Sequence, residues 1–206
     1  FDIRKDSLYC DRPDSLRRRA ARTVMDRLFH CLTAWLAPIT CFTAEEAWLS
    51  RGGGDAASVH LRRYPVLPES WRDDALGERW AKLRNLRRVI TGALELKRAD
   101  KTIGSSLQAT PHLHASAALV ALAEGVDLAE IAITSDIAVT VGPVPAGAFT
   151  LPDLPDAGVV VEPAAGEKCD RCWKFVRDRG VDPAHPTVCG RCADAVGRHV
   201  TAEAAR

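Results

Sequence analysis

The chain has 206 residues, of which 47% are hydrophobic and 27% charged, and its formal net charge is +1. This length accommodates one good core and a small accessory module. A net charge so close to zero argues against a uniformly basic nucleic-acid-binding protein, and the absence of any apolar run of about eighteen residues excludes a membrane-spanning helix. Because the chain starts at Phe1 in sequence typical of a structured region, we expect it to be the C-terminal piece of a longer protein.

The first half of the chain predicts three helices. Apolar residues recur at helical spacing over residues 15–36, with Asp14 or Ser15 able to cap the start. Thr43 and Glu46 have the spacing of a capping box and predict the start of a second helix. The glycine run within residues 52–55 predicts a loop, and a long third helix is expected over about residues 74–100.

The long third helix is locally basic. Residues 79–101 carry eight basic residues against two acidic ones. The basic residues are Arg79, Lys82, Arg84, Arg87, Arg88, Lys97, Arg98 and Lys101, and the acidic ones are Glu95 and Asp100. Such a surplus is typical either of a solvated helix face or of a surface that neutralises RNA phosphates.

Beyond Gly104 the pattern changes from long helices to short elements. Strands are expected at residues 107–114 and 137–141, with an alanine-rich helix near residues 116–124 between them. Four prolines within residues 143–155 predict a linker. A short apolar strand is then expected at residues 159–161.

Two cysteine pairs close to the C-terminus carry the most specific signal. Cys169, Cys172, Cys189 and Cys192 follow the pattern C-x2-C-x16-C-x2-C. Two such knuckles can place four thiolates around one ion at about 2.3 Å, the closed tetrahedral arrangement of structural zinc. Disulfides and a thioredoxin-like redox pair are the alternatives. Paired knuckles joined by a segment rich in turn residues favour zinc, and four thiolates leave no open position for a catalytic water.

Several strings, in order along the chain, resemble bacterial isoleucyl-tRNA synthetases. The opening segment, residues 1–10, is similar to the segment that enters the anticodon-binding domain of that family. Residues 35–39 followed by 42–48 resemble the helix-break-helix signature of class I synthetases for branched aliphatic amino acids. Residues 58–61 and 101–107 also match the isoleucine family, and Cys169 to Trp173 with the second cysteine pair resembles its C-terminal zinc finger.

The resemblance implies a fold class that is mainly α. A helical-bundle anticodon-binding domain is expected over residues 1–104, a small α/β junction with its proline-rich linker over 105–165, and a four-cysteine zinc finger over 166–206. The family's ATP-binding signatures are absent from this sequence, and no stretch matches its editing domain. The chain is therefore expected to supply no catalytic residue.

The resemblance further implies the partner and the site. The expected partner is the tRNA for isoleucine, bound by a cytoplasmic, monomeric enzyme that contacts neither DNA nor a membrane. One structural Zn²⁺ is expected here, and ATP only in the missing catalytic domain. Arg171 and Trp173 match family positions implicated in anticodon contact, and Arg84, Arg87 and Arg88 are expected on the RNA-facing helix. Trp173 has an alternative role, as a cover for the zinc site.

Two other functions fit parts of the sequence. A DNA-repair glycosylase of the formamidopyrimidine class ends in a similar four-cysteine hairpin, but its N-terminal proline has no counterpart in Phe1-Asp2. A zinc-stabilised helical protein with a protein partner is the third alternative.

Overall fold

The computed structural model describes residues 1–52 and 58–204, with side chains through residue 198. The chain divides into two compact units. One unit comprises Phe1–Arg12 and Asp74–Arg206, and the other comprises Pro13–Asp73. The glycine-rich loop expected at residues 52–55 falls mostly outside the described residues. Within the described part of the chain, no helix is both long enough and apolar enough to cross a bilayer.

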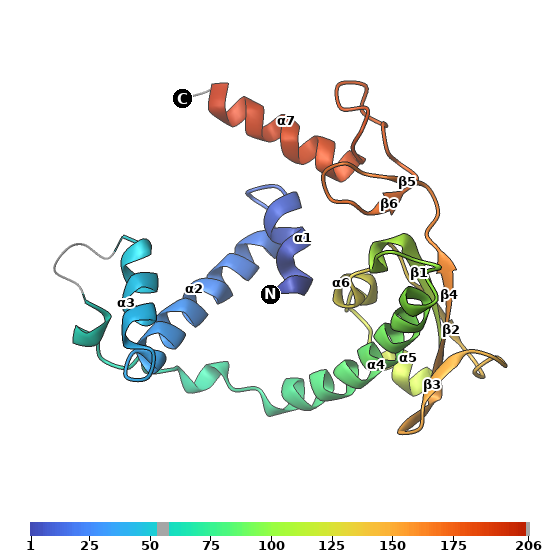
Figure 1. Ribbon diagram of the computed structural model, residues 1–206, viewed down its shortest axis with the longest axis horizontal. Coiled ribbons are helices and arrows are strands. Elements are labelled where there is room, and N and C mark those ends of the chain that lie inside the picture. The colour runs from blue at the N-terminus through green and yellow to red at the C-terminus, as the bar shows by residue number, and fades with distance from the viewer. Residues whose placement is uncertain (53–57, 205–206) are drawn as a thin grey trace. The chain divides into compact units, whose positions relative to one another are not determined.

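A four-stranded mixed sheet organises the larger unit (Figure 1). β1 (Ala109–Ala115) runs parallel to β2 (Ala138–Val141) on one side and antiparallel to β4 (Leu154–Pro163) on the other. β3 (Phe149–Leu151) completes the order β2-β1-β4-β3 by pairing with β4. Alternate residues of β1 are buried, so the sheet packs one face against a helix.

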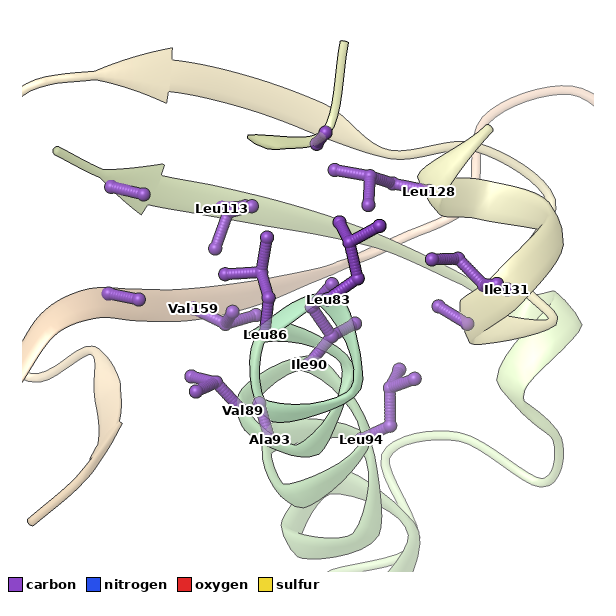
Figure 2. Close-up of a cluster of buried hydrophobic side chains, with 14 of the residues drawn as sticks. Leu83, Leu86, Val89, Ile90, Ala93, Leu94, Leu113, Leu128, Ile131 and Val159 are labelled. Atoms are coloured by element: carbon purple, nitrogen blue, oxygen red, sulfur yellow. The ribbon is translucent and has the colours of Figure 1, made fainter. Parts of the chain in front are cut away.

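That helix is α4 (Asp74–Ala99), the long helix expected from the sequence. Its apolar stripe packs on the sheet and on α6 (Leu128–Ala132), and Figure 2 shows these side chains meeting between the elements. The largest fully buried members from the helix and the sheet are Leu83, Leu86, Val89, Ile90, Leu94 and Leu113. This cluster is the core of the larger unit, because burial of aliphatic side chains is the main stabilising contribution of such packing.

Two arginines of α4 bind the C-terminal ends of the short helices beside it. Arg79 donates from Nε to the Leu122 carbonyl, 2.9 Å away, at the end of α5 (Ala117–Leu122). Arg87 donates from Nε to the Ile131 carbonyl at 2.7 Å, in the last turn of α6. The last carbonyls of a helix lack intrahelical donors and carry partial negative charge, so both contacts stabilise the short helices. Part of the basic character of α4 is therefore used within the fold.

The C-terminal segment that contains the four paired cysteines belongs to the same unit. β5 (Glu167–Lys168) pairs antiparallel with β6 (Phe175–Val176), and α7 (Gly190–Ala204) follows. α1 (Asp2–Cys10), from the opposite end of the chain, also belongs to this unit. Three 3₁₀ turns, Val59–Leu61, Glu69–Trp71 and Ser106–Gln108, complete the regular structure of the described residues.

The smaller unit contains α2 (Leu16–Leu36) and α3 (Cys41–Ser50). Ser15 caps α2 as expected, its hydroxyl accepting from the Arg18 amide at 3.4 Å. The Trp48 ring stacks on Phe29 and lies 4.0 Å beneath the Arg62 guanidinium. Aromatic and cation–π contacts of this kind supplement a core of small residues, Ala37, Ala44 and Val59.

The capping box predicted at Thr43 is wrong. α3 begins two residues earlier, at Cys41, and Thr43 lies inside its first turn. The cause is the tight turn that ends α2, where the Thr40 amide donates to the Leu36 carbonyl at 2.8 Å and so sets the start of the next helix. Glu45 caps a different element, since it accepts from the Val59 amide at 2.7 Å.

The linker predicted over residues 143–155 is also wrong in part. This segment contains β3 and the start of β4, which extends well beyond the strand expected at 159–161. Gly158 explains how the proline-rich connection packs, because a Cβ at this position would lie 2.3 Å from the Val144 side chain. The connection therefore folds over the sheet at Gly158.

The fold class expected from the sequence is confirmed only in part. Long helices are present, but a four-stranded mixed sheet forms the core of the larger unit, so the chain combines α and β structure. The division into compact units groups residues 1–12 with residues 74–206. The predicted domain boundaries at residues 104 and 165 separate regions by expected function and not by compactness, and they stay a prediction.

Candidate metal centre and nucleic-acid interface

The first cysteine knuckle is the turn between β5 and β6. The Cys169 amide donates to the Lys174 carbonyl and the Trp173 amide to the Cys169 carbonyl, both at 2.9 Å. Trp173 closes this turn in the left-handed region, with φ of 65°. The turn places the thiols of Cys169 and Cys172 on the same side.

The second knuckle is the N-terminus of α7. Cys189 immediately precedes the helix, and Cys192 lies in its first turn. The Gly190 amide is held by Asp178 at 3.0 Å, and the Cys189 amide donates to the Cys169 sulfur at 3.3 Å. A helix N-terminus carries partial positive charge, which stabilises a thiolate once a metal has displaced its proton.

The four predicted ligands come together. All four sulfur atoms lie within 4.8 Å of one another, and the Cys172 and Cys189 sulfurs are 3.9 Å apart. Bonds of about 2.3 Å to a tetrahedral ion require sulfur separations of roughly 3.8 Å. Cys169, Cys189 and Cys192 are buried, Cys172 is half-buried, and none forms a disulfide. Thus the donor set and its spacing fit a tetrahedral metal ion, and Cys169, Cys172, Cys189 and Cys192 are the residues that would hold it.

The thiols of Cys172, Cys189 and Cys192 have raised pKa values. The hydrogen bond with Cys192, together with burial, raises the pKa of Cys172 to about 12. The hydrogen bond with Cys10, together with burial, raises the pKa of Cys192 to about 12. Burial also raises the pKa of Cys189. A metal ion that binds these sulfurs must therefore displace protons at neutral pH.

We expect metal affinity to rise steeply with pH. Each proton displaced per ion adds about one power of ten per pH unit to the apparent binding constant, and the rise continues across about pH 6 to 8 because the pKa values of Cys172, Cys189 and Cys192 lie above that range. Competition with a chelator at several pH values measures this slope. Cys41→Ser removes an exposed cysteine outside the cage and is expected to leave the slope unchanged. An affinity independent of pH would contradict thiolate coordination.

The structure places Trp173 on the surface beside the cage. Its side chain is 60% exposed, and the Lys168 ammonium lies 5.5 Å from the ring centroid. The alternative that Trp173 covers the metal site is not supported by this exposure. An indole that is open to solvent and accompanied by a cation can stack on an unpaired base.

Arg171 lies against α1. Its Nη1 donates to the Cys10 carbonyl at 2.6 Å and its Nη2 to the Tyr9 carbonyl at 2.8 Å. Like Arg79 and Arg87, it satisfies carbonyls at the C-terminal end of a helix. The structure thus brings Arg171 close to Trp173 but directs its guanidinium to protein carbonyls.

The three arginines expected on the RNA-facing helix have different surroundings. Arg87 donates to the end of α6, and Arg88 forms an ion pair of 2.9 Å with Asp153. Arg84 is exposed, and among the described residues it makes no hydrogen bond or ion pair. Of the three, Arg84 is the one whose charge is most available to a ligand.

A pocket beside the cage is a part of the site that sequence reasoning missed. It has a volume of about 430 Å³ and is lined mainly by apolar atoms from α1, α6 and the first knuckle, including Ile3, Tyr9, Ile133 and Trp173. Its charged lining residues have both signs and include Lys5, Lys174, Asp2 and Glu130. Ile133 is also left-handed, with φ of 59°, so two of the three non-glycine residues with positive φ in the described chain line this pocket. Strained residues of this kind gather at functional sites.

The comparison with protein families identifies the class to which the chain belongs. Residues 1–113 match the anticodon-binding domain of tRNA ligases, and the chain belongs to that family. Residues 166–195, which contain all four cage cysteines, match the zinc finger found in FPG and IleRS. The anticodon-binding match over the first half of the chain disfavours the glycosylase alternative.

The similar curated proteins are isoleucine–tRNA ligases. That of Mesorhizobium japonicum is 52% identical over 197 residues, which cover 94% of this chain and 20% of the relative. The ligase of Ruegeria pomeroyi is 54% identical over 198 residues and that of Bartonella henselae 48% over 197, again with 20% of each relative covered. The chain therefore spans about a fifth of the length of the relatives it matches.

Proposed function

We propose that this chain is the tRNA-binding C-terminal part of an isoleucine–tRNA ligase and contributes anticodon recognition without catalytic residues. The whole enzyme would join isoleucine to its tRNA at the expense of ATP, with ATP bound by a catalytic domain outside this chain. We further propose that the enzyme is a cytoplasmic monomer that does not bind DNA or membranes. The observation that carries the proposal is the exposed Trp173, held on a cysteine knuckle at the edge of an apolar pocket.

We propose that the four cysteines hold one Zn²⁺. Four thiolates in a closed cage are the ligand set of structural zinc, and they leave no position for a reacting water. The ion supplies no chemistry to a substrate. It fixes the turn from which the Trp173 indole projects, because the two-residue strands β5 and β6 cannot hold that turn alone.

The pocket and its rim suit an unpaired base of the anticodon loop. Proteins read single-stranded RNA by stacking its bases on aromatic rings and by contacting base edges. Tyr9 is 74% exposed and Trp173 is 60% exposed, so two aromatic rings are available at one pocket. Lys168 and Lys174 add positive charge that attracts phosphates without sequence preference, whereas Lys5 pairs with Asp2 at 2.6 Å.

Replacing Trp173 by Ala tests the proposal. Loss of one stacked base costs about 1–3 kcal/mol, or roughly 5- to 150-fold in Kd. We expect a loss of this size for the isoleucine tRNA transcript and a smaller loss for a transcript with a different anticodon. Filter binding at fixed salt measures both. Trp173→Phe, which retains a ring, is expected to lose less.

Val181→Ala provides the control. Val181 is 65% exposed and belongs to the same module, but it does not line the pocket. This substitution is expected to leave both Kd values unchanged. Equal losses on the two transcripts for Trp173→Ala would show that the indole supports binding without reading the anticodon.

A further inference from the structure

The second residue between the cysteines is an arginine in both knuckles. Arg171 precedes Cys172 and Arg191 precedes Cys192, so each guanidinium is anchored one residue from a metal ligand. We call Arg171 and Arg191 the knuckle arginines. Both reach the same element, helix α1, which lies more than 150 residues away in the sequence.

Arg191 contacts two carboxylates, one on α1 and one on the residue that directly follows α1. Its Nη1 and Nη2 donate to the two oxygens of Asp6 at 2.6 and 2.7 Å, and Nη1 also donates to Asp11 at 3.1 Å. The Asp11 side chain is only 7% exposed, and that of Asp6 21%. A bidentate ion pair of this kind is stronger and more directional than a single ion pair. Arginine can form it because its guanidinium group presents two parallel N–H donors.

Arg171 contacts α1 through its backbone. It donates to the Tyr9 and Cys10 carbonyls, and the Cys10 thiol lies 3.8 Å from the Arg171 carbonyl oxygen in return. Cys10 is 6% exposed and packs with Cys169, Cys189 and Cys192. The last turn of α1 therefore covers the cage.

Charged groups of both signs meet at this junction. A divalent ion with four thiolates carries a net charge of −2, and the carboxylates of Asp6 and Asp11 lie close by. The two guanidinium groups are the cations placed between them, Arg191 near Cys172 and Arg171 near Cys192. Removing either would take a positive charge away from partly buried negative groups.

We propose that the knuckle arginines are positioning residues that couple metal binding to helix α1. In this arrangement the metal orients both knuckles, the knuckles fix the two guanidinium groups, and these hold the C-terminal turn of α1. That turn carries Tyr9, so the coupling also sets one wall of the pocket opposite Trp173. The inference rests on the proposed metal site but not on RNA binding.

Release of zinc to a chromogenic chelator tests the coupling on the 206-residue chain. Groups that orient metal ligands typically change affinity by about 10- to 100-fold. We expect Arg191→Gln to accelerate release by about tenfold or more. Arg191→Lys keeps the charge but not the bidentate hydrogen bonding, and we expect it to have a smaller effect. Arg198→Gln alters an exposed arginine of α7 that pairs with Asp194, and it is expected to release zinc at the unaltered rate.

Alkylation of Cys10 reports the state of α1 independently. In the zinc-loaded chain Cys10 is buried and should react slowly. Asp6→Asn changes only the α1 side of the junction, and we expect it both to expose Cys10 and to accelerate zinc release. The double variant Asp6→Asn with Arg191→Gln should be no worse than the more severe single variant.

The outcomes separate two questions. A chain that binds no zinc would refute the metal site itself. A zinc-loaded chain in which Asp6→Asn leaves both zinc release and Cys10 reactivity unchanged would overturn the coupling while leaving the metal site and the proposed RNA function intact. Additive effects of Asp6→Asn and Arg191→Gln would also overturn it, because independent contributions do not constitute coupling.

Discussion

Removal of the metal is expected to unfold the finger, residues 166–198, while the four-stranded sheet stays folded. Apart from the metal ligands, the cluster around the cage contains, among the described residues, half-buried Val176 and Val188 and the neighbouring Cys10. The finger's two strands have two residues each. So small a cluster cannot offset the entropy of ordering the segment, whereas structural zinc contributes on the order of 10 kcal/mol in comparable peptides.

Thiol labelling after chelation measures this result residue by residue. Cys41 is exposed and should react at once in the zinc-loaded chain. The four cage cysteines should become reactive only after chelation, and Cys10 should follow them if α1 is released. Cys31 is buried in the smaller unit and should stay protected, which makes it the internal control. Cage thiols that react equally with and without chelator would show that the metal does not hold the finger together.

The cage could be predicted because its signal is local. Each pair of cysteines is separated by two residues, and a knuckle turn brings them together whatever the rest of the chain does. The contacts of Arg171 and Arg191 with α1 could not be predicted, because they join positions more than 150 residues apart. The sequence shows one arginine between the cysteines of each pair. It does not distinguish an arginine that contacts RNA from one that contacts a helix of the same protein.

The same reason explains why the roles of the basic residues of α4 could not be predicted. The surplus of positive charge was visible in the sequence, but Arg79 and Arg87 donate to the ends of α5 and α6, more than 40 residues away. α6 has only five residues and was not predicted at all. Short helices of this kind are stabilised by tertiary contacts, here by the α4 arginines and the core, and local propensity reveals little of them.

The linker prediction was wrong in part because proline content alone does not exclude strands. Proline is excluded mainly from central strand positions that donate to a neighbour, and it is tolerated near strand ends. β4 has Pro155 and Pro163 close to its ends and an apolar centre from Ala157 to Val161. The long helices, by contrast, were predicted well, since their periodic apolar residues extend over five or more turns.

Truncation of Leu86 to Ala is the second large effect expected, and it tests the core on which α6, one wall of the pocket, packs. Leu86 is 1% exposed and lies in the cluster that joins α4 to the sheet and α6. Leucine-to-alanine changes at such sites lower the free energy of unfolding by about 2–5 kcal/mol, since a cavity forms that the neighbours fill only partly. Hydrogen exchange of the β1 amides is the suitable measurement, because the two units need not unfold together.

The expected loss of protection at Leu113 in β1 is roughly 30-fold or more, the equivalent of about 2 kcal/mol. Leu96→Ala is the matched control on the same helix. Leu96 is 57% exposed, and alanine is the better helix former, so little change is expected there. Because the proposed metal holds the finger, we expect its cage cysteines to stay protected in Leu86→Ala. Simultaneous exposure of the cage would mean that finger and sheet unfold as one cooperative unit.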